Sequence, residues 1–128
     1  METRPPPKGT RAVIPHLLAT LGYSLAGGRF LLTQRAARLQ LGMLAVTVVA
    51  FAALGVGPVQ WAIMLALFLV SLGVEAINTA IELIVDRTSP EISDFAKNAK
   101  DLGSFAVFCA LVVFGGHAAW VVAAAVLG

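Results

Sequence analysis

Acidic and amide side chains interrupt an otherwise apolar stretch of the chain at residues 74–86, which read VEAINTAIELIVD. Four polar residues follow Glu75 at +3, +4, +7 and +11, namely Asn78, Thr79, Glu82 and Asp86. At about 100° per residue, these positions share roughly a 100° arc of one helix face. Three carboxylates, an amide and a hydroxyl therefore lie on a face that must meet protein, water or a ligand. Simple helix pairing through hydrogen bonds is the alternative, and it suits Asp86 better than the two glutamates.

A second charged cluster precedes the last apolar run of the sequence. Its members are Glu91, Asp94, Lys97, Lys100 and Asp101. Asp94 with Lys97, and Lys97 with Asp101, have the spacing of ion pairs on a solvated helix, so we interpret Asp94 and Lys97 as surface residues. Lys100 borders the apolar run, where an ammonium group can neutralise phosphate oxygens. We therefore expect a functional role for Lys100.

The composition indicates which kind of element positions these groups. Of 128 residues, 59% are hydrophobic and only 12% are charged, against about 45–50% and about 25% in ordinary globular proteins. A small soluble domain has proportionally more surface to cover with polar groups, so we expect an integral membrane protein of one domain. Cys109 is the only cysteine, which excludes an internal disulfide. The net charge of +2, with no dense basic tract, argues against nucleic-acid binding.

Two uncharged runs, 39–74 and 102–128, supply the membrane-spanning helices. One span needs about 20 mostly apolar residues, and the sequence GVGP at 55–58 should end one helix and begin another. The fold class is therefore an all-α membrane protein with three transmembrane helices. We predict spans at about 39–56, 59–85 and 102–126.

The basic residues predict the orientation of these spans. Six of the nine lysines and arginines precede the first span, and the remaining three lie between the second and third spans. Residues 55–60 contain none. The positive-inside rule then places the N-terminus and the 86–101 segment in the cytoplasm and the C-terminus outside.

The residues before the first span are expected to form two parts. A disordered tail is predicted for residues 1–10, which contain three consecutive prolines. The remaining residues, 11–128, would form a single membrane domain. Its first element is a predicted amphipathic helix at about 15–35, with Leu17 and Leu21 on one stripe, lying on the cytoplasmic face of the membrane.

Depth distinguishes the two glutamates of the second span. Counted from Val59 at the outer interface, Glu75 lies about 24 Å along the helix and Glu82 about 35 Å. In a bilayer with a core of about 30 Å, Glu75 would lie just below the cytoplasmic headgroups and Glu82 among them. A carboxylate at the first depth can reach the hydroxyl of a lipid, and one at the second can hold a metal ion with water-soluble phosphates.

The chain resembles the small prokaryotic diacylglycerol kinases and their undecaprenol kinase relatives. The family signature E-x-[LIVM]-N-[ST]-[SA]-[LIV]-E-x-x-V-D is matched at every specified position by residues 75–86. Residues 89–91 (SPE) and 99–104 (AKDLGS) are similar to the second block of the family, and residues 22–24 (GYS) to its N-terminal segment. The resemblance covers roughly residues 16–115.

This resemblance implies Mg²⁺- and ATP-dependent phosphorylation of the primary hydroxyl of a membrane lipid. It implies a homotrimer in the bacterial cytoplasmic (inner) membrane, with active sites shared between subunits at the cytoplasmic face. Glu75 would be the general base and bind the lipid, and Glu82 would ligate the metal and the nucleotide. The other implied site residues are Asn78 and Lys100 as catalytic groups, Tyr23, Glu91, Lys100 and Asp101 for the nucleotide, and Ser104 for the lipid.

One departure from the family concerns a glutamate that commonly precedes the first span and shares the metal. Here residues 33–38 read TQRAAR, so Gln34 is its counterpart, or Arg35 if the register shifts by one residue. A neutral amide oxygen ligates Mg²⁺ more weakly than a carboxylate does.

Several alternatives remain open from the sequence. Diacylglycerol is favoured over undecaprenol as the lipid acceptor, because residues 100–104 are more similar to the diacylglycerol branch. A small proton-coupled multidrug transporter, which also uses a membrane glutamate, and a non-catalytic membrane subunit are more remote readings. ATP consumption that depends on added lipid alcohol would separate a kinase from both.

Overall fold

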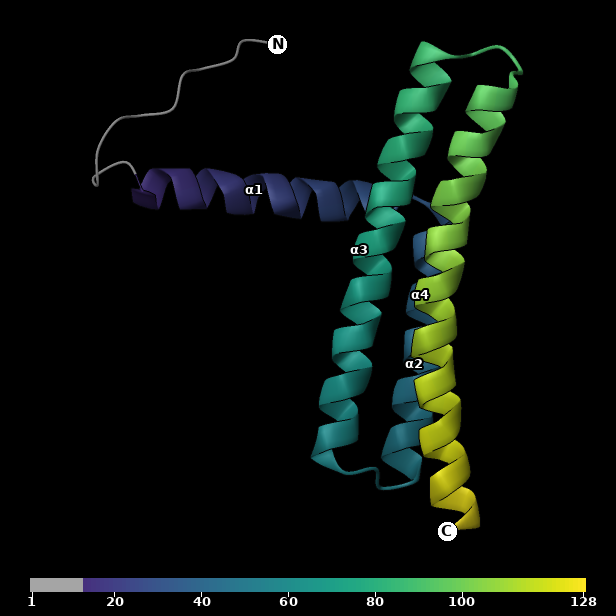
Figure 1. Cartoon of the computed structure of the whole chain (residues 1–128). Helices are drawn as coiled ribbons and strands as arrows, with labels where there is room; N and C mark the ends of the chain where they lie inside the picture. The colour runs from purple at the N-terminus through teal and green to yellow at the C-terminus, as the bar shows by residue number, and fades with distance from the viewer. Residues whose placement is uncertain (1–12) are drawn as a thin grey trace.

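Four helices connected by short turns make up the computed structural model, which describes residues 13–128 (Figure 1). They are α1 (Val13–Leu31), α2 (Arg35–Ala53), α3 (Pro58–Thr88) and α4 (Asp94–Leu127). The described part of the chain contains no strand, as the all-α prediction requires. The tail predicted for residues 1–10 lies outside the described residues.

Three of these helices are long and apolar enough to cross a membrane, namely α2, α3 and α4. Their outward faces carry large apolar side chains, including Val46 on α2, Leu69 on α3 and Phe105 on α4, each more than 60% exposed in the single chain. Lipid is the solvent that such a surface favours. The number of candidate spans equals the three predicted, and their length and composition are those of a multi-pass membrane protein.

Local sequence signals determine where α2 ends and α3 begins. Gly55 adopts a left-handed conformation (φ 64°), and the amide of Val56 donates to the carbonyl of Phe51, which closes the end of α2. Gly57 is the N-cap of α3, and Pro58 follows at its first turn, where a missing N–H costs nothing. The helix break predicted at residues 55–58 is thus present.

The helices extend beyond the predicted spans on the side of the charged residues. The segment 86–101, which separates the second and third predicted spans, is mostly helical, because α3 continues to Thr88 and α4 already begins at Asp94. Ser93 caps α4 by accepting a hydrogen bond from the amide of Ala96 at 3.1 Å. Hydropathy marks the edge of the membrane, whereas this cap marks the edge of the helix, so the two boundaries differ.

The interior of the bundle has an apolar half and a polar half. Near the 54–57 turn, buried Phe51, Met64, Phe68, Phe114 and Val121 form a hydrophobic cluster. Towards the opposite end, polar side chains are buried beside apolar ones such as Ala37 and Val85. These polar residues are Gln40, Ser71, Glu75, Asn78 and Thr79. The polar half is the part that α1 crosses (Figure 1).

Helix α1 lies across the bundle instead of along it (Figure 1). It occupies much of the region predicted for a surface helix, and its residues Val13–Phe30 are exposed in the single chain. Beyond the level of α1, α3 and α4 continue together to the 89–93 connection (Figure 1). The chain thus places a crossing helix beside the paired helices that carry the acidic residues.

Candidate active site

A cavity of about 370 Å³ lies where the α1–α2 corner meets α3 and α4. The corner contributes Gln34, Arg35 and Ala36 to its wall, and α4 contributes Ser104 and Val107. Helix α3 supplies four polar side chains, those of Glu75, Asn78, Thr79 and Glu82. Two carboxylates that lie two turns apart on one helix therefore share a single cavity, as their spacing predicts.

Glu75 is held at the inner wall of this cavity. The residue is only 3% exposed, and its Oε2 accepts a hydrogen bond of 3.2 Å from Nε2 of Gln40 on α2. Gln40 is also buried, and its own Oε1 has no hydrogen-bond partner among the described residues. An amide donor fixes the orientation of a carboxylate while leaving its second oxygen available to a ligand.

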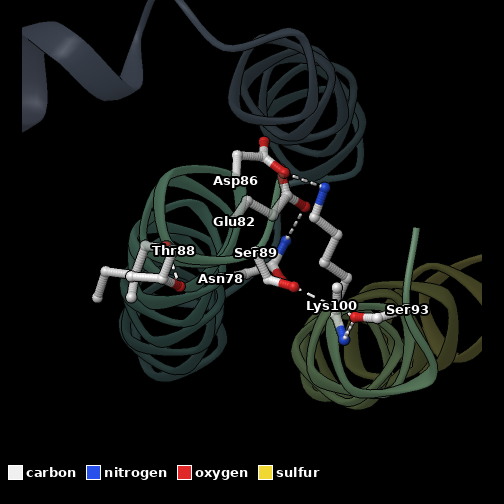
Figure 2. A network of polar contacts seen from close by, with 9 residues as sticks. Asn78, Glu82, Asp86, Thr88, Ser89, Ser93 and Lys100 are labelled. Carbon is white, nitrogen blue, oxygen red and sulfur yellow. Dashed lines mark hydrogen bonds and ion pairs between the residues drawn. The ribbon is translucent and has the colours of Figure 1, made fainter. Parts of the chain in front are cut away.

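Asn78 and Glu82 form a coupled pair one turn apart on α3. Nδ2 of Asn78 donates to Oε1 of Glu82 at 3.1 Å (Figure 2). Oδ1 of Asn78 is buried without a partner and lies against Gly103 of α4, where a Cβ atom would overlap it. Glycine at 103 therefore provides the space in which Asn78 can orient Glu82.

Lys100 is held by an acidic residue of the neighbouring helix α3. Its Nζ forms an ion pair with Oδ1 of Asp86 across the α3–α4 interface (Figure 2). Both residues line a neighbouring cavity of about 220 Å³, together with Glu91 and Lys97. Lys100 thus borders the polar end of the bundle, and Asp86 holds it there.

The remaining predicted site residues lie at different distances from the main cavity. Ser104 lines it, and Glu91 lines the neighbouring one. Asp101 is exposed and pairs with Lys97 at 2.6 Å, the surface pair expected from their spacing. Tyr23 on α1 is 77% exposed and lines neither cavity. A single chain therefore gathers Glu75, Asn78, Glu82 and Ser104, but leaves Tyr23 apart.

The donor groups of the cavity suit Mg²⁺ only as part of a larger shell. Within residues 13–128, no group of three His, Cys, Asp or Glu side chains is close enough to hold a metal ion. Mg²⁺ is commonly bound by one or two carboxylates together with substrate phosphates and water. Glu82, already oriented by Asn78, fits such a partial site, and the Gln34 amide adds a neutral oxygen to the same wall.

An apolar cavity of about 400 Å³ adjoins the polar one. It lies between α1 and α3 and is lined by small and apolar residues, among them Gly27, Gly28, Leu72 and Ala76. Thr79 lines both cavities, so they meet at this residue. The apolar cavity could accommodate an acyl chain, and the adjoining polar cavity could accommodate a polar headgroup.

Sequence reasoning missed two partners of the site. Gln40 was not singled out, although it is one of few polar residues in the uncharged run and could have been found as such. The pairing of Asp86 with Lys100 was also missed, because it joins residues on two helices and no helical spacing predicts it.

Comparisons with known proteins agree with the geometry. Residues 22–124 match the family model for prokaryotic diacylglycerol kinase. A diacylglycerol kinase of Sinorhizobium sp is 50% identical over 109 residues, covering 85% of this chain and 80% of that protein. The diacylglycerol kinase of Pseudomonas aeruginosa is 42% identical over 110 residues, covering 85% and 89%, and that of Escherichia coli K12 is 33% identical over 98 residues, covering 76% and 80%. By these matches, the chain belongs to the prokaryotic diacylglycerol kinase family.

Proposed function

We propose that this protein transfers the terminal phosphate of ATP to the primary hydroxyl of diacylglycerol. The observation that carries this proposal is the pair of adjoining cavities that meet at Thr79, one apolar and one lined by Glu75 and Glu82. An acyl chain suits the first space, and the reacting hydroxyl and phosphates suit the second. Relatives named diacylglycerol kinase support this acceptor over undecaprenol.

Glu75 acts as the general base in this mechanism. Its carboxylate accepts the proton of the lipid hydroxyl while the oxygen forms a bond to the terminal phosphorus of ATP. The bond from that phosphorus to the bridging oxygen breaks, and its electron pair leaves with ADP. The hydrogen bond from Gln40 keeps the Glu75 carboxylate in place during the transfer.

Glu82 and Lys100 bind the nucleotide, Glu82 through the metal ion and Lys100 through the phosphates. Glu82 would hold Mg²⁺, which when bound supplies positive charge at the phosphates. Asn78 orients Glu82 through the hydrogen bond between their side chains. Lys100, held by Asp86, lies beside Glu91 in the neighbouring cavity, where its ammonium group attracts the outer phosphates. Asp101 is assigned to nucleotide binding together with Lys100. Ser104 contacts the lipid in the main cavity.

The proposed setting is the cytoplasmic face of the bacterial inner membrane. The basic residues before α2 and between α3 and α4 support this orientation. Helix α1 would lie on the membrane surface as the amphipathic element. Three copies of the chain would assemble as a homotrimer. The exposure of Tyr23 supports such an assembly, because this residue can then reach the nucleotide of an adjacent subunit.

A direct assay tests the function. Purified protein in nonionic detergent would receive ATP, Mg²⁺ and either diacylglycerol or undecaprenol, and the phosphorylated lipid would be identified by mass spectrometry. We expect phosphatidic acid and little undecaprenyl phosphate. Faster formation of undecaprenyl phosphate would show that undecaprenol is the preferred acceptor. ATP consumption that does not depend on added lipid would contradict the lipid kinase assignment.

Glu82→Gln is expected to raise the Mg²⁺ concentration needed for half-maximal activity by about tenfold or more, because a neutral amide replaces a charged ligand. Titration of Mg²⁺ at saturating ATP measures the shift. Asp94→Asn is the matched control, since Asp94 is a carboxylate that lines neither cavity. An unchanged Mg²⁺ titration for Glu82→Gln would remove this residue from the metal site.

Gln40→Leu is expected to lower kcat by about tenfold or more, the usual effect of losing a hydrogen bond to a charged group. The KM for ATP should stay within about twofold, because Gln40 contacts Glu75 and does not line the main cavity. Gln40→Glu tests the donor itself, because it keeps the size but cannot donate to an ionised carboxylate. Equal effects on kcat and on the KM for ATP would instead indicate a general disturbance of the site.

A further inference from the structure

Among residues 13–128, Arg35 carries the only positive charge in the wall of the main cavity. It is the first residue of α2 and shares this wall with the carboxylates of Glu75 and Glu82. The side chain is exposed, so a ligand that enters the cavity can reach it. The corner between α1 and α2 thus brings a guanidinium group to the place where the phosphate transfer is proposed.

The two lysines near the site already have acidic partners. Lys100 is paired with Asp86, and Lys97 with Asp101. Arg35 has no such partner anywhere in residues 13–128. Of the three, Arg35 is therefore the one whose charge is not shared with an acidic side chain.

The position of Arg35 within α2 is unfavourable for the helix itself. The first turn of a helix has a partial positive charge and is stabilised by acidic residues, yet α2 has none there, and the Gln34 side chain makes no capping hydrogen bond. An arginine in this turn adds like charge. An anion bound in the cavity would offset this repulsion, because it would interact with both the guanidinium group and the N-terminus of α2.

We infer that Arg35 binds the terminal phosphate of the nucleotide and neutralises the charge that develops on it during transfer. This inference rests on the proposed function, because it takes the cavity to be the site of phosphate transfer. Guanidinium is well suited to the task, since its planar fork can donate two parallel hydrogen bonds to one phosphate group. Arg35 is thereby a catalytic residue that adds protein charge beside the partial metal site at Glu82.

Nucleotide binding without metal tests the inference separately from turnover. The affinities of ATP and ADP would be measured by calorimetry in EDTA, in a nonionic detergent free of phospholipid, so that no lipid phosphate competes. Arg35→Gln should weaken ATP binding by about tenfold or more and leave ADP binding within about twofold, because ADP lacks the terminal phosphate. Arg35→Lys should fall between wild type and Arg35→Gln, because it keeps the charge but loses the fork.

Arg38→Gln is the matched control. It makes the same charge change one turn along α2, but Arg38 does not line the cavity, so ATP binding should be unchanged. Equal losses for ATP and ADP, equal losses for both arginine variants, or no ATP binding to the wild type without metal would each overturn the inference. The binding measurement needs no lipid. Failure of the wild type to phosphorylate diacylglycerol would therefore contradict the proposed function, whereas the difference between ATP and ADP binding would still report on Arg35.

Discussion

Replacing Glu75 with glutamine is expected to abolish phosphorylation of the lipid, with a loss in kcat of about 10²–10⁴-fold or more. Glutamine has almost the same shape and can still contact Gln40 on α2, but its amide cannot accept the hydroxyl proton. Because Glu82 and Lys100 are untouched, nucleotide binding should persist. The variant should therefore separate chemistry from binding.

Single-turnover phosphorylation of diacylglycerol and calorimetric binding of Mg-ATP measure the two properties. Thr79→Val serves as a control, since it alters the wall of the same cavity without removing a carboxylate. It should retain far more activity than Glu75→Gln. Comparable turnover by Glu75→Gln and wild type would exclude Glu75 as the base.

Gly103→Ala should lower activity by about tenfold or more although it adds only one methyl group. The new Cβ would overlap Oδ1 of Asn78, with Cγ of Asn78 only 3.3 Å away, so the Asn78 side chain must move. That movement breaks its 3.1 Å hydrogen bond to Glu82, and a hydrogen bond to a charged group is worth roughly tenfold or more. The Mg²⁺ dependence should change together with kcat.

Gly115→Ala is the matched control on the same helix. A Cβ at Gly115 would meet nothing within 4 Å, so this change should leave activity intact and, as is usual for alanine in a helix interior, slightly favour folding. Kinetics and thermal unfolding of both variants in detergent make the comparison. If Gly103→Ala were as active as Gly115→Ala, Asn78 would not depend on the space at residue 103.

Hydropathy and helical spacing were sufficient to predict the spans and the shared face of Glu75 and Glu82. Both depend on properties of one helix at a time, and the break at residues 55–58 depends on local backbone preferences. The family signature then predicted which of these acids share a site. These features need no knowledge of how helices pack.

What the sequence did not predict depends on pairs of helices. The contact of Gln40 with Glu75 joins α2 to α3, and the pairing of Lys100 with Asp86 joins α4 to α3. The start of α4 was predicted too late, because the Ser93 cap lies outside the apolar run. Arg35 appeared only as an alternative register for Gln34, and both residues in fact line the cavity.

The division of the bundle interior has a practical consequence for engineering. The aromatic cluster around Phe51, Phe68 and Phe114 lies away from the acids, and it holds the three long helices together at the opposite end. Substitutions there can adjust heat tolerance or detergent resistance with little effect on catalysis. Stability and chemistry thus depend on opposite ends of one small helical bundle, so that each can be altered while the other is kept.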